Sequence, residues 1–286
     1  RRVSARGVAA RLGVALAALA AVAVALFHLT AATEGLVVEH TTVEGTPVTI
    51  HRPADGEPAP AVVIAHGFAG SRQLMQPFAV TLARNGYVAV SFDFRGHGRN
   101  PKPLTGDVTE ETGATRVLVA ETGRIVAFAR GHAAATGEVA LLGHSMASDI
   151  VVRTAVADPD IAATVAVSMF SKAVTATEPR NLLVIIGEWE SFLAEEALRA
   201  VSLSIEGEAE EGVTYGSLAD GTARRAVLAD NVEHVGVLYS PESMAAARDW
   251  MHAVFGRTGS GYVEARGPWV VMLLGGIVAL GWPLAA

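Results

Sequence analysis

The sequence predicts one α/β domain, a mostly parallel sheet covered by helices, between two apolar segments at the ends of the chain. Short β-rich runs alternate with helical stretches over residues 35–260, the pattern that a parallel sheet with covering helices produces. Several of these runs are continuously apolar, as expected of strands buried on both faces. Both ends contain long uncharged stretches of a length that could cross a bilayer.

Eight strands and five helices are expected in the central region. The first two strands form an opening hairpin, and helices separate most of the others. Asn85-Gly86 and Gly131 favour helix ends. The strands are expected at 37–43, 47–51, 61–65, 88–92, 139–142, 163–168, 182–186 and 225–228, and the helices at 74–85, 114–130, 146–157, 190–201 and 241–255.

The N-terminal apolar segment covers residues 12–32 and follows four arginines. Its length matches a bilayer crossing and exceeds the apolar region of a signal peptide, and no clean Ala-x-Ala site precedes Glu34. We therefore expect a retained membrane anchor over residues 1–34, with a cleaved signal as the alternative.

The C-terminal segment, residues 267–286, has no charged side chain, and its glycines and Pro283 make it a poor helix for a soluble protein. A second crossing is therefore expected, and the alternative is a packed helix. The chain lacks a starting methionine and stops within this run, which is typical of a fragment. Because fewer arginines, Arg257 and Arg266, precede this segment than the first, we expect a cytoplasmic N-terminus and an extracytoplasmic central domain.

Composition excludes several functions. The net charge is −7 and the basic residues form no long run, so nucleic acid is not an expected partner. The chain has no cysteine, which excludes thiolate catalysis, disulfides and cysteine-based zinc sites. No cluster of histidine and carboxylate residues indicates a catalytic metal, and we expect neither a metal nor a cofactor.

The most informative motif is Gly143-His144-Ser145-Met146-Ala147, between an apolar strand and a helical stretch. A serine at such a strand-turn-helix junction has strained backbone geometry that exposes its hydroxyl above the sheet edge. Ser145 is therefore the candidate nucleophile. The usual pattern has glycine where Ala147 stands. The alternative is an ordinary turn in which Ser145 caps the helix.

Two further motifs follow the preceding strands. His66-Gly67-Phe68 comes after residues 61–65, where the backbone N–H of Phe68 could pair with that of Met146 to bind an oxyanion. The run Asp-Phe-Arg-Gly-His-Gly follows at 93–98. In this order the motifs resemble the α/β-hydrolase superfamily, especially its esterase and dienelactone-hydrolase-like members, although dienelactone hydrolases proper use cysteine. The resemblance implies the α/β-hydrolase fold and a hydrolytic reaction more firmly than it implies a substrate.

The resemblance also implies an acid and a histidine downstream of the serine. Members of the superfamily commonly have Gly-x-x-Asp after the strand at 182–186, and Glu190 occupies that place, with Glu188 as its rival. His234 follows the last strand and is the candidate general base. Four other histidines are expected to be structural, in turns, in a loop or on a helix surface: His66, His144, His97 and His252.

These residues predict a carboxylesterase-like serine hydrolase that cleaves small-molecule esters or related acyl compounds through an acyl-enzyme. Only residues 170–181 separate two strands, so we expect no large lid and an open cleft lined by Phe68, Met146 and Trp189. The sequence does not exclude peptide or thioester substrates, nor an acyl-transfer reaction in place of hydrolysis. The alternatives are a non-catalytic binding or scaffolding module of a membrane protein and a soluble secreted esterase; the sequence does not indicate the natural substrate, the acyl length or the oligomeric state.

Overall fold

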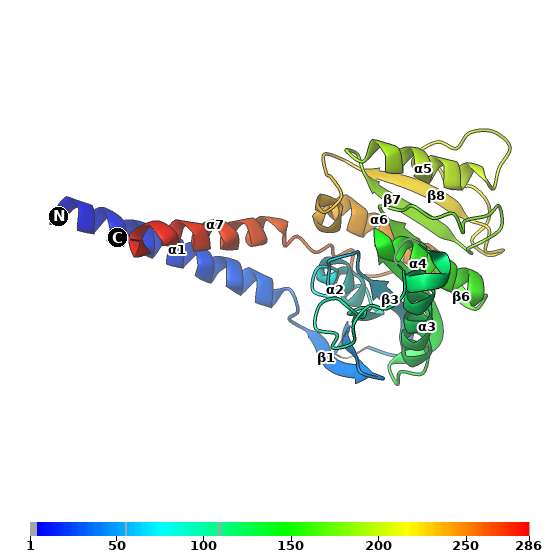
Figure 1. Ribbon diagram of the computed structural model, residues 1–286, viewed down its shortest axis with the longest axis horizontal. Coiled ribbons are helices and arrows are strands. Elements are labelled where there is room, and N and C mark those ends of the chain that lie inside the picture. Colours follow the sequence, from blue (N-terminus) through cyan, green and yellow to red (C-terminus); the bar gives the residue numbers. More distant parts are fainter. Residues whose placement is uncertain (1–4, 55, 108–109, 286) are drawn as a thin grey trace. The chain divides into compact units, whose positions relative to one another are not determined.

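The computed structural model describes residues 5–54, 56–107 and 110–285, and these form two compact units. The larger unit, Gly35–Glu264, contains the sheet (Figure 1). The smaller unit combines the described residues up to Glu34 with those from Ala265 onward. Arg1 and Arg2, two of the four arginines behind the predicted orientation, lie outside the described residues.

The larger unit is built on an eight-stranded sheet in the order β1-β2-β4-β3-β5-β6-β7-β8. β1 and β2 form an antiparallel hairpin, β2 also pairs antiparallel with β4, and all other pairings are parallel. The mostly parallel sheet predicted from the sequence is thus confirmed. The strands are β1 Leu36–Val43, β2 Thr46–Pro53, β3 Ala59–Ala65, β4 Val88–Phe92, β5 Ala135–His144, β6 Ile161–Val167, β7 Leu182–Gly187 and β8 Arg224–Ala229.

Strand β5 differs most from its predicted extent of 139–142. It begins at Ala135, which pairs with Ala59, and it ends at His144. Its first residues include Thr136 and Gly137, and they are less buried than the apolar part that follows. The hydrophobic run therefore indicated only the portion of the strand that is covered on both faces.

Helices cover both faces of this sheet. Phe78 of α2 and Met244 of α6 pack in one core cluster with Ile64, whereas Leu118 of α3 and Val151 of α4 pack in another. Successive side chains of a strand point to opposite faces, so α2 and α6 cover one face and α3 and α4 the other. The helices are α2 Gln76–Arg84, α3 Arg116–Arg130, α4 Met146–Ala157, α5 Ser191–Ser202 and α6 Pro241–Phe255.

Two short helical turns complete the larger unit. The helix expected at 114–130 is preceded by a π-helical turn, Glu111–Thr115, with non-helical backbone at Gly113, so the regular part begins only at Arg116. A 3₁₀ turn, Gly236–Tyr239, leads into α6, whose N-cap residue Ser240 accepts a hydrogen bond from the backbone N–H of Ser243.

The carboxyl ends of the parallel strands meet at one edge of the sheet, and this edge is open. The connection from β6 to β7 contains no helix, so the predicted absence of a large lid is confirmed. In sheets of this kind, ligands bind outside the carboxyl ends of the strands. The motifs at Ser145, Glu190 and His234 follow β5, β7 and β8 at this edge.

The smaller unit consists of two apolar helices, α1 Ala5–Ala31 and α7 Gly267–Leu284. They pack side by side and antiparallel, since the rings of His28 and Trp269 stack 3.7 Å apart while Gly276 lies against Ala18. A Cβ atom on Gly276 would lie 3.1 Å from the carbonyl oxygen of Ala18. Small residues thus allow a close approach of the two backbones, a feature common between membrane helices.

Most apolar side chains of these two helices are exposed. Leu16, Phe27 and Val278 are examples, whereas the core helix of a soluble protein would bury such residues. Both helices are long and apolar enough to cross a membrane. The predicted pair of terminal apolar helices is therefore confirmed.

Candidate active site

Ser145 lies in a strained turn between β5 and α4. Its backbone has φ 54° and ψ −120°, which non-glycine residues rarely adopt. Its N–H donates to the carbonyl oxygen of Val167 at 2.9 Å, and its side chain makes no hydrogen bond that caps α4. The turn is tight because Gly143 has no side chain, since a Cβ there would lie 2.5 Å from the carbonyl oxygen of Ala147.

His234 reaches this serine from the loop between β8 and α6. Its Nε2 lies 2.8 Å from Ser145 Oγ. A hydrogen bond fixes this loop to the end of β5, because His144 Nε2 donates to the backbone carbonyl of His234 at 2.8 Å. The ring is partly exposed and so remains accessible from the open edge of the sheet.

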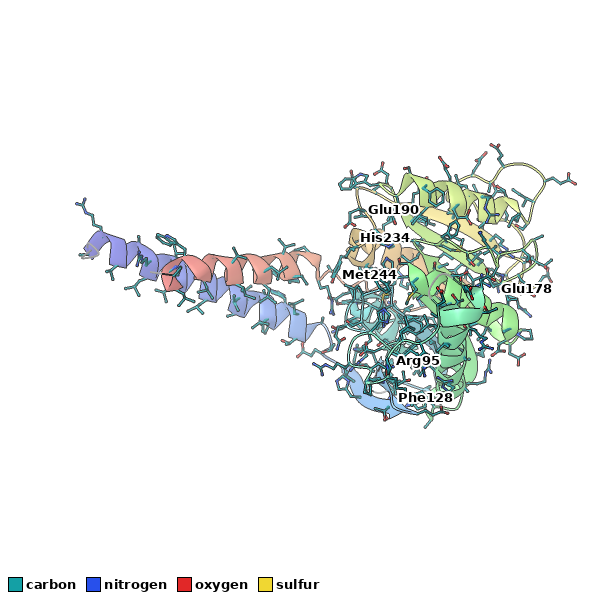
Figure 2. The ribbon with its side chains drawn as sticks, in the orientation of Figure 1. Arg95, Phe128, Glu178, Glu190, His234 and Met244 are labelled. Carbon is teal, nitrogen blue, oxygen red and sulfur yellow. The ribbon has the colours of Figure 1, made fainter. Side chains whose placement is uncertain are left out.

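Glu190 is the carboxylate that contacts His234, with Oε1 at 2.5 Å from Nδ1 (Figure 2). Its other oxygen, Oε2, accepts from Ser168 Oγ at 2.7 Å and from the N–H of Gly187 at 2.9 Å. The Glu190 side chain is almost fully buried. The rival, Glu188, is exposed and accepts from the N–H of Asn231.

The two ring nitrogens of His234 have different partners. With Nδ1 donating to the Glu190 carboxylate, Nε2 is the nitrogen that accepts from the Ser145 hydroxyl. The three side chains form one hydrogen-bonded line along which a proton can move from Oγ to Nε2. The structure thus brings together the three residues selected from the sequence.

Phe68 and Met146 belong to two backbone segments that meet at Ser145. A Cβ on Gly67 would lie 3.0 Å from Ser145 Cβ, so the turn that carries Phe68 runs directly beside the serine. Met146 is the first residue of α4, and the first N–H groups of a helix lack an intrahelical partner and carry the positive end of its dipole.

Two buried histidines support this arrangement. Nδ1 of His66 donates to the carbonyl of Gly67, and its Nε2 accepts from the N–H of Phe94 at 3.1 Å. Burial lowers the pKa of His66 to about 4, and burial likewise lowers the pKa of His144 to about 4. Both rings are therefore neutral at pH 7 and serve as structural links between loops of the site.

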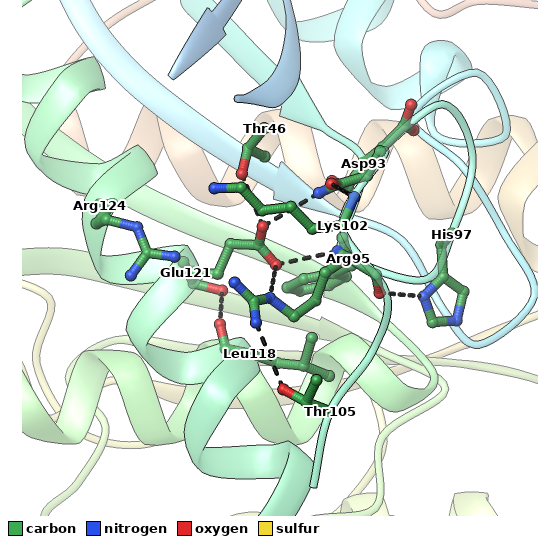
Figure 3. Close-up of polar contacts among 12 residues, drawn as sticks. Thr46, Asp93, Arg95, His97, Lys102, Thr105, Leu118, Glu121 and Arg124 are labelled. Carbon is green, nitrogen blue, oxygen red and sulfur yellow. Dashed lines mark hydrogen bonds and ion pairs between the residues drawn. The ribbon is translucent and has the colours of Figure 1, made fainter. Parts of the chain in front are cut away.

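A second polar network fixes the loop after β4. Glu121, fully buried on α3, accepts from Thr46 Oγ1 at 2.7 Å and from the N–H of Arg95 at 3.1 Å (Figure 3). Asp93, also fully buried, is paired with Arg72 and accepts from the N–H of Arg99. The two carboxylates thus hold in place a loop that the parallel strands alone do not support.

A cleft of about 320 Å³ lies next to the turn that carries Ser145, with Phe68 and Met146 in its wall, whereas Ser145, His234 and Glu190 do not line it. Most of its wall is apolar, and the one carboxylate in it, Asp149, is paired with Arg153 and accepts from Ser171 Oγ. Trp189, which we expected here, is not part of the wall and is instead exposed next to Glu190. The residues that line the cleft are Phe68, Leu104, Ala114, Thr115, Leu118, Met146, Asp149 and Ile150.

Besides Trp189, two residues of the site and one histidine outside it differ from the sequence-based expectation. Ser168 was expected only as the last residue of a strand, yet it binds Glu190. Glu121 was expected only as part of a helix, although its place among Leu118, Thr122 and Ile125 on one helix face could have indicated burial. His252 is not a free surface residue, because it is partly buried and hydrogen-bonds the Tyr87 hydroxyl at 2.8 Å.

A protein-family model described as serine aminopeptidase, S33, matches residues 56–206, more than half of the chain. The match begins before β3 and ends after α5, so it includes the turn at Ser145 and the acidic residue Glu190. No curated protein sequence matches this chain.

Solved structures with this fold are similar to the chain over most of its length. A CIB-like hydrolase of Thermoplasma acidophilum is 18% identical and covers 76% of this chain and 97% of its own, with a TM-score of 0.55. An esterase of Pyrobaculum calidifontis is 16% identical and covers 85% and 93%, with a TM-score of 0.54. A bacterial membrane phospholipase A is 14% identical and covers 87% and 97%, with a TM-score of 0.53. At these identities the likeness establishes the fold.

Replacing Gly143 by alanine should distort the turn that carries Ser145. The new Cβ would meet the backbone of Ala147 at 2.5 Å, so the turn must shift, at a cost of about 1–3 kcal/mol of unfolding free energy. Thermal unfolding of the detergent-solubilised chain measures this. The matched control is Gly123→Ala on α3, where a Cβ meets nothing within 4 Å and unfolding should shift slightly upward. Equal stability of the two variants would contradict the close approach at Gly143.

Acid should destabilise the larger unit through His66 and His144. Above pH 6.5 both are neutral whether the chain is folded or unfolded; between pH 6.5 and about 4 only the unfolded chain takes up the protons, so stability is lost as pH falls. Each group accounts for up to about 3 kcal/mol. The melting temperature of His144→Gln should therefore fall less between about pH 7.5 and pH 5 than that of the wild type. The control is His40→Gln, at an exposed histidine, whose melting temperature should fall as far as that of the wild type.

Proposed function

This chain belongs to the serine aminopeptidase S33 family of α/β-hydrolases, and on that premise we propose that it is a serine hydrolase that cleaves carboxylic esters. Its nucleophile would be Ser145, its general base His234 and the acid of its triad Glu190. The observation that carries the proposal is the continuous line of contacts from Ser145 Oγ to His234 Nε2 at 2.8 Å and from His234 Nδ1 to Glu190 Oε1 at 2.5 Å.

The proposed reaction proceeds in two halves. Ser145 Oγ attacks the carbonyl carbon of the ester while its proton passes to His234 Nε2, and the Glu190 carboxylate stabilises the imidazolium. The backbone N–H groups of Phe68 and Met146 would bind the oxyanion of the tetrahedral intermediate. His234 then protonates the leaving alcohol, which leaves an acyl group on Ser145. A water molecule, deprotonated by His234, releases the carboxylic acid and restores the serine.

The character of the cleft favours esters with an apolar part over peptides with a free amino terminus. Its wall is mainly apolar, which suits an acyl or alkyl chain. The one carboxylate in the wall of the cleft, Asp149, is paired with Arg153, so the wall itself offers a substrate ammonium no unpaired carboxylate. We accordingly propose a carboxylesterase-like specificity for small-molecule esters, with residues 35–260 as the hydrolase domain.

We also propose that α1 and α7 cross a membrane and tether this domain to it. Their exposed apolar side chains need a lipid environment, since a patch of that size is rarely left in water. Four arginines precede the apolar run that begins at residue 12, two of them at the start of α1, against two before α7, and this excess favours a cytoplasmic N-terminus and an extracytoplasmic hydrolase domain. Protease treatment of intact spheroplasts tests this topology. Digestion of the domain would support an extracytoplasmic location, and full protection would place the domain in the cytoplasm.

A fluorophosphonate probe tests the nucleophile. Wild-type protein should be labelled at Ser145, and Ser145→Ala should lose both the label and ester hydrolysis, with kcat/KM reduced roughly 10⁴-fold or more. Ser148→Ala is a useful comparison, because that neighbouring serine is buried and bonds only to the backbone of Ser145. An unlabelled wild-type protein would instead support a binding or scaffolding module.

A panel of p-nitrophenyl acyl esters, set against aminoacyl anilides, tests the substrate class.

Glu190 and Glu188 can be separated by a pair of matched substitutions. Glu190→Gln should lower kcat for a soluble ester on the order of 10³-fold, because the amide no longer holds the proper tautomer of His234 or stabilises its charged form. Glu188→Gln should lie within about threefold of wild type, since Glu188 contacts only the loop backbone at Asn231 in the described contacts. Reversal of these two effects would assign the acid to Glu188.

A further inference from the structure

Several exposed apolar side chains belong to, or lie close along the chain to, the residues of the candidate site. Phe68, Phe170, Trp189, Phe192 and Val235, here called the apolar rim, have exposed fractions of 69%, 45%, 64%, 64% and 46%. Apart from Val235, all are aromatic. In the described part of the larger unit, every phenylalanine or tryptophan that is exposed belongs to this rim. Such a concentration of exposed apolar surface marks an interaction site.

The chain positions of the rim residues tie them to the site. Trp189 and Phe192 flank Glu190, and Val235 follows His234. Phe170 lies two residues after Ser168, and its ring stacks against that of Phe192 at a centroid distance of 5.9 Å. These residues follow β6, β7 and β8, whose carboxyl ends meet at one edge of the sheet.

We propose that the apolar rim docks on a lipid bilayer, and that the enzyme takes esters with apolar acyl chains directly from the lipid phase. This inference rests on the proposed function and names its substrate class. Aromatic side chains are favoured at the boundary between lipid headgroups and acyl chains, since their rings are apolar at one end and tolerate water at the other.

The membrane that α1 and α7 are proposed to cross is itself the lipid surface for this docking. Only residues 32–35 separate α1 from β1, and residues 256–266 separate α6 from α7. Four residues span at most roughly 14 Å even when fully extended. If α1 crosses a bilayer, the hydrolase domain is therefore never far from the headgroups, and a lipid surface is present at high local concentration. A soluble partner is not held at such a local concentration.

The charge around the rim indicates which lipids it meets. Within three positions of the rim residues along the chain, the exposed charged side chains are three carboxylates, Glu188, Glu195 and Glu233, and one cation, Lys172. An excess of negative charge at the contact is repelled by anionic headgroups. The rim therefore suits a zwitterionic surface, and docking should weaken as anionic lipid is added.

Single-cysteine labelling tests the docking directly, because the natural chain has no cysteine. The full chain is prepared as Phe192→Cys or Leu203→Cys, labelled with an environment-sensitive dye and reconstituted into phosphatidylcholine vesicles that contain a lipid-borne quencher. Phe192 lies in the first turn of α5 at the rim, whereas Leu203, also exposed, is the C-cap residue of α5, about 16 Å further along the helix axis. We expect a blue shift and quenching for the probe at position 192 and neither for the probe at position 203.

Equal quenching at the two positions, or none at position 192, overturns the proposal. Cross-linking between copies through position 192 without quenching would assign the rim to a second copy of the chain, which also overturns it. The dye reads docking whether or not the protein is catalytic. Fluorophosphonate labelling of Ser145 in the same vesicles therefore distinguishes failure of this inference from failure of the proposed function.

Activity measured on two forms of substrate tests the second half of the inference. For a combined Phe170→Ser, Trp189→Ser and Phe192→Ser variant, the rate on a long-chain ester dissolved in vesicles, divided by the rate on a water-soluble acetate ester, should fall about tenfold. The matched control replaces exposed apolar residues away from the rim: Val156, Leu203 and Val213, each by serine. An equal fall in both ratios, or no fall in either, would contradict lipid-phase delivery.

Discussion

The candidate site depends on how the carboxylate of Glu190 is held. It is buried, and its two oxygens bind groups from three segments of chain: Ser168 after β6, Gly187 at the end of β7, and His234 after β8. A buried carboxylate without such partners would be too costly to keep ionised. Because every partner comes from the end of a neighbouring parallel strand, the alignment of His234 toward Ser145 follows directly from the register of the sheet.

Close backbone approaches make this convergence possible. Gly187 lets the end of β7 meet the His234 loop, since a Cβ there would lie 2.6 Å from the carbonyl oxygen of Val232. Gly67 and Gly143 play the same part around Ser145. Larger side chains at these three positions would separate the loops that carry the serine, the histidine and the acid. The glycines thus set the distances in the site without taking part in its chemistry.

The sequence predicted the fold and the three central side chains because both depend on local patterns. Continuous apolar runs mark strands buried on both faces, and Ser145, Glu190 and His234 each follow such a run. Residues defined by contacts distant in the sequence were not found in this way. Glu121 meets Thr46 across 75 positions, and Ser168 meets Glu190 across 22. Trp189 was misplaced for a related reason, since adjacency to Glu190 does not fix the side of the loop on which its ring lies.

The antiparallel pairing of α1 with α7 has a consequence for release of the catalytic part. The domain between them is connected at both of its ends to the same helical pair, whose backbones meet closely at Ala18 and Gly276. A single proteolytic cut in either connecting segment leaves the domain attached through the other one. Shedding it as a free fragment requires two cuts, one in each connecting segment.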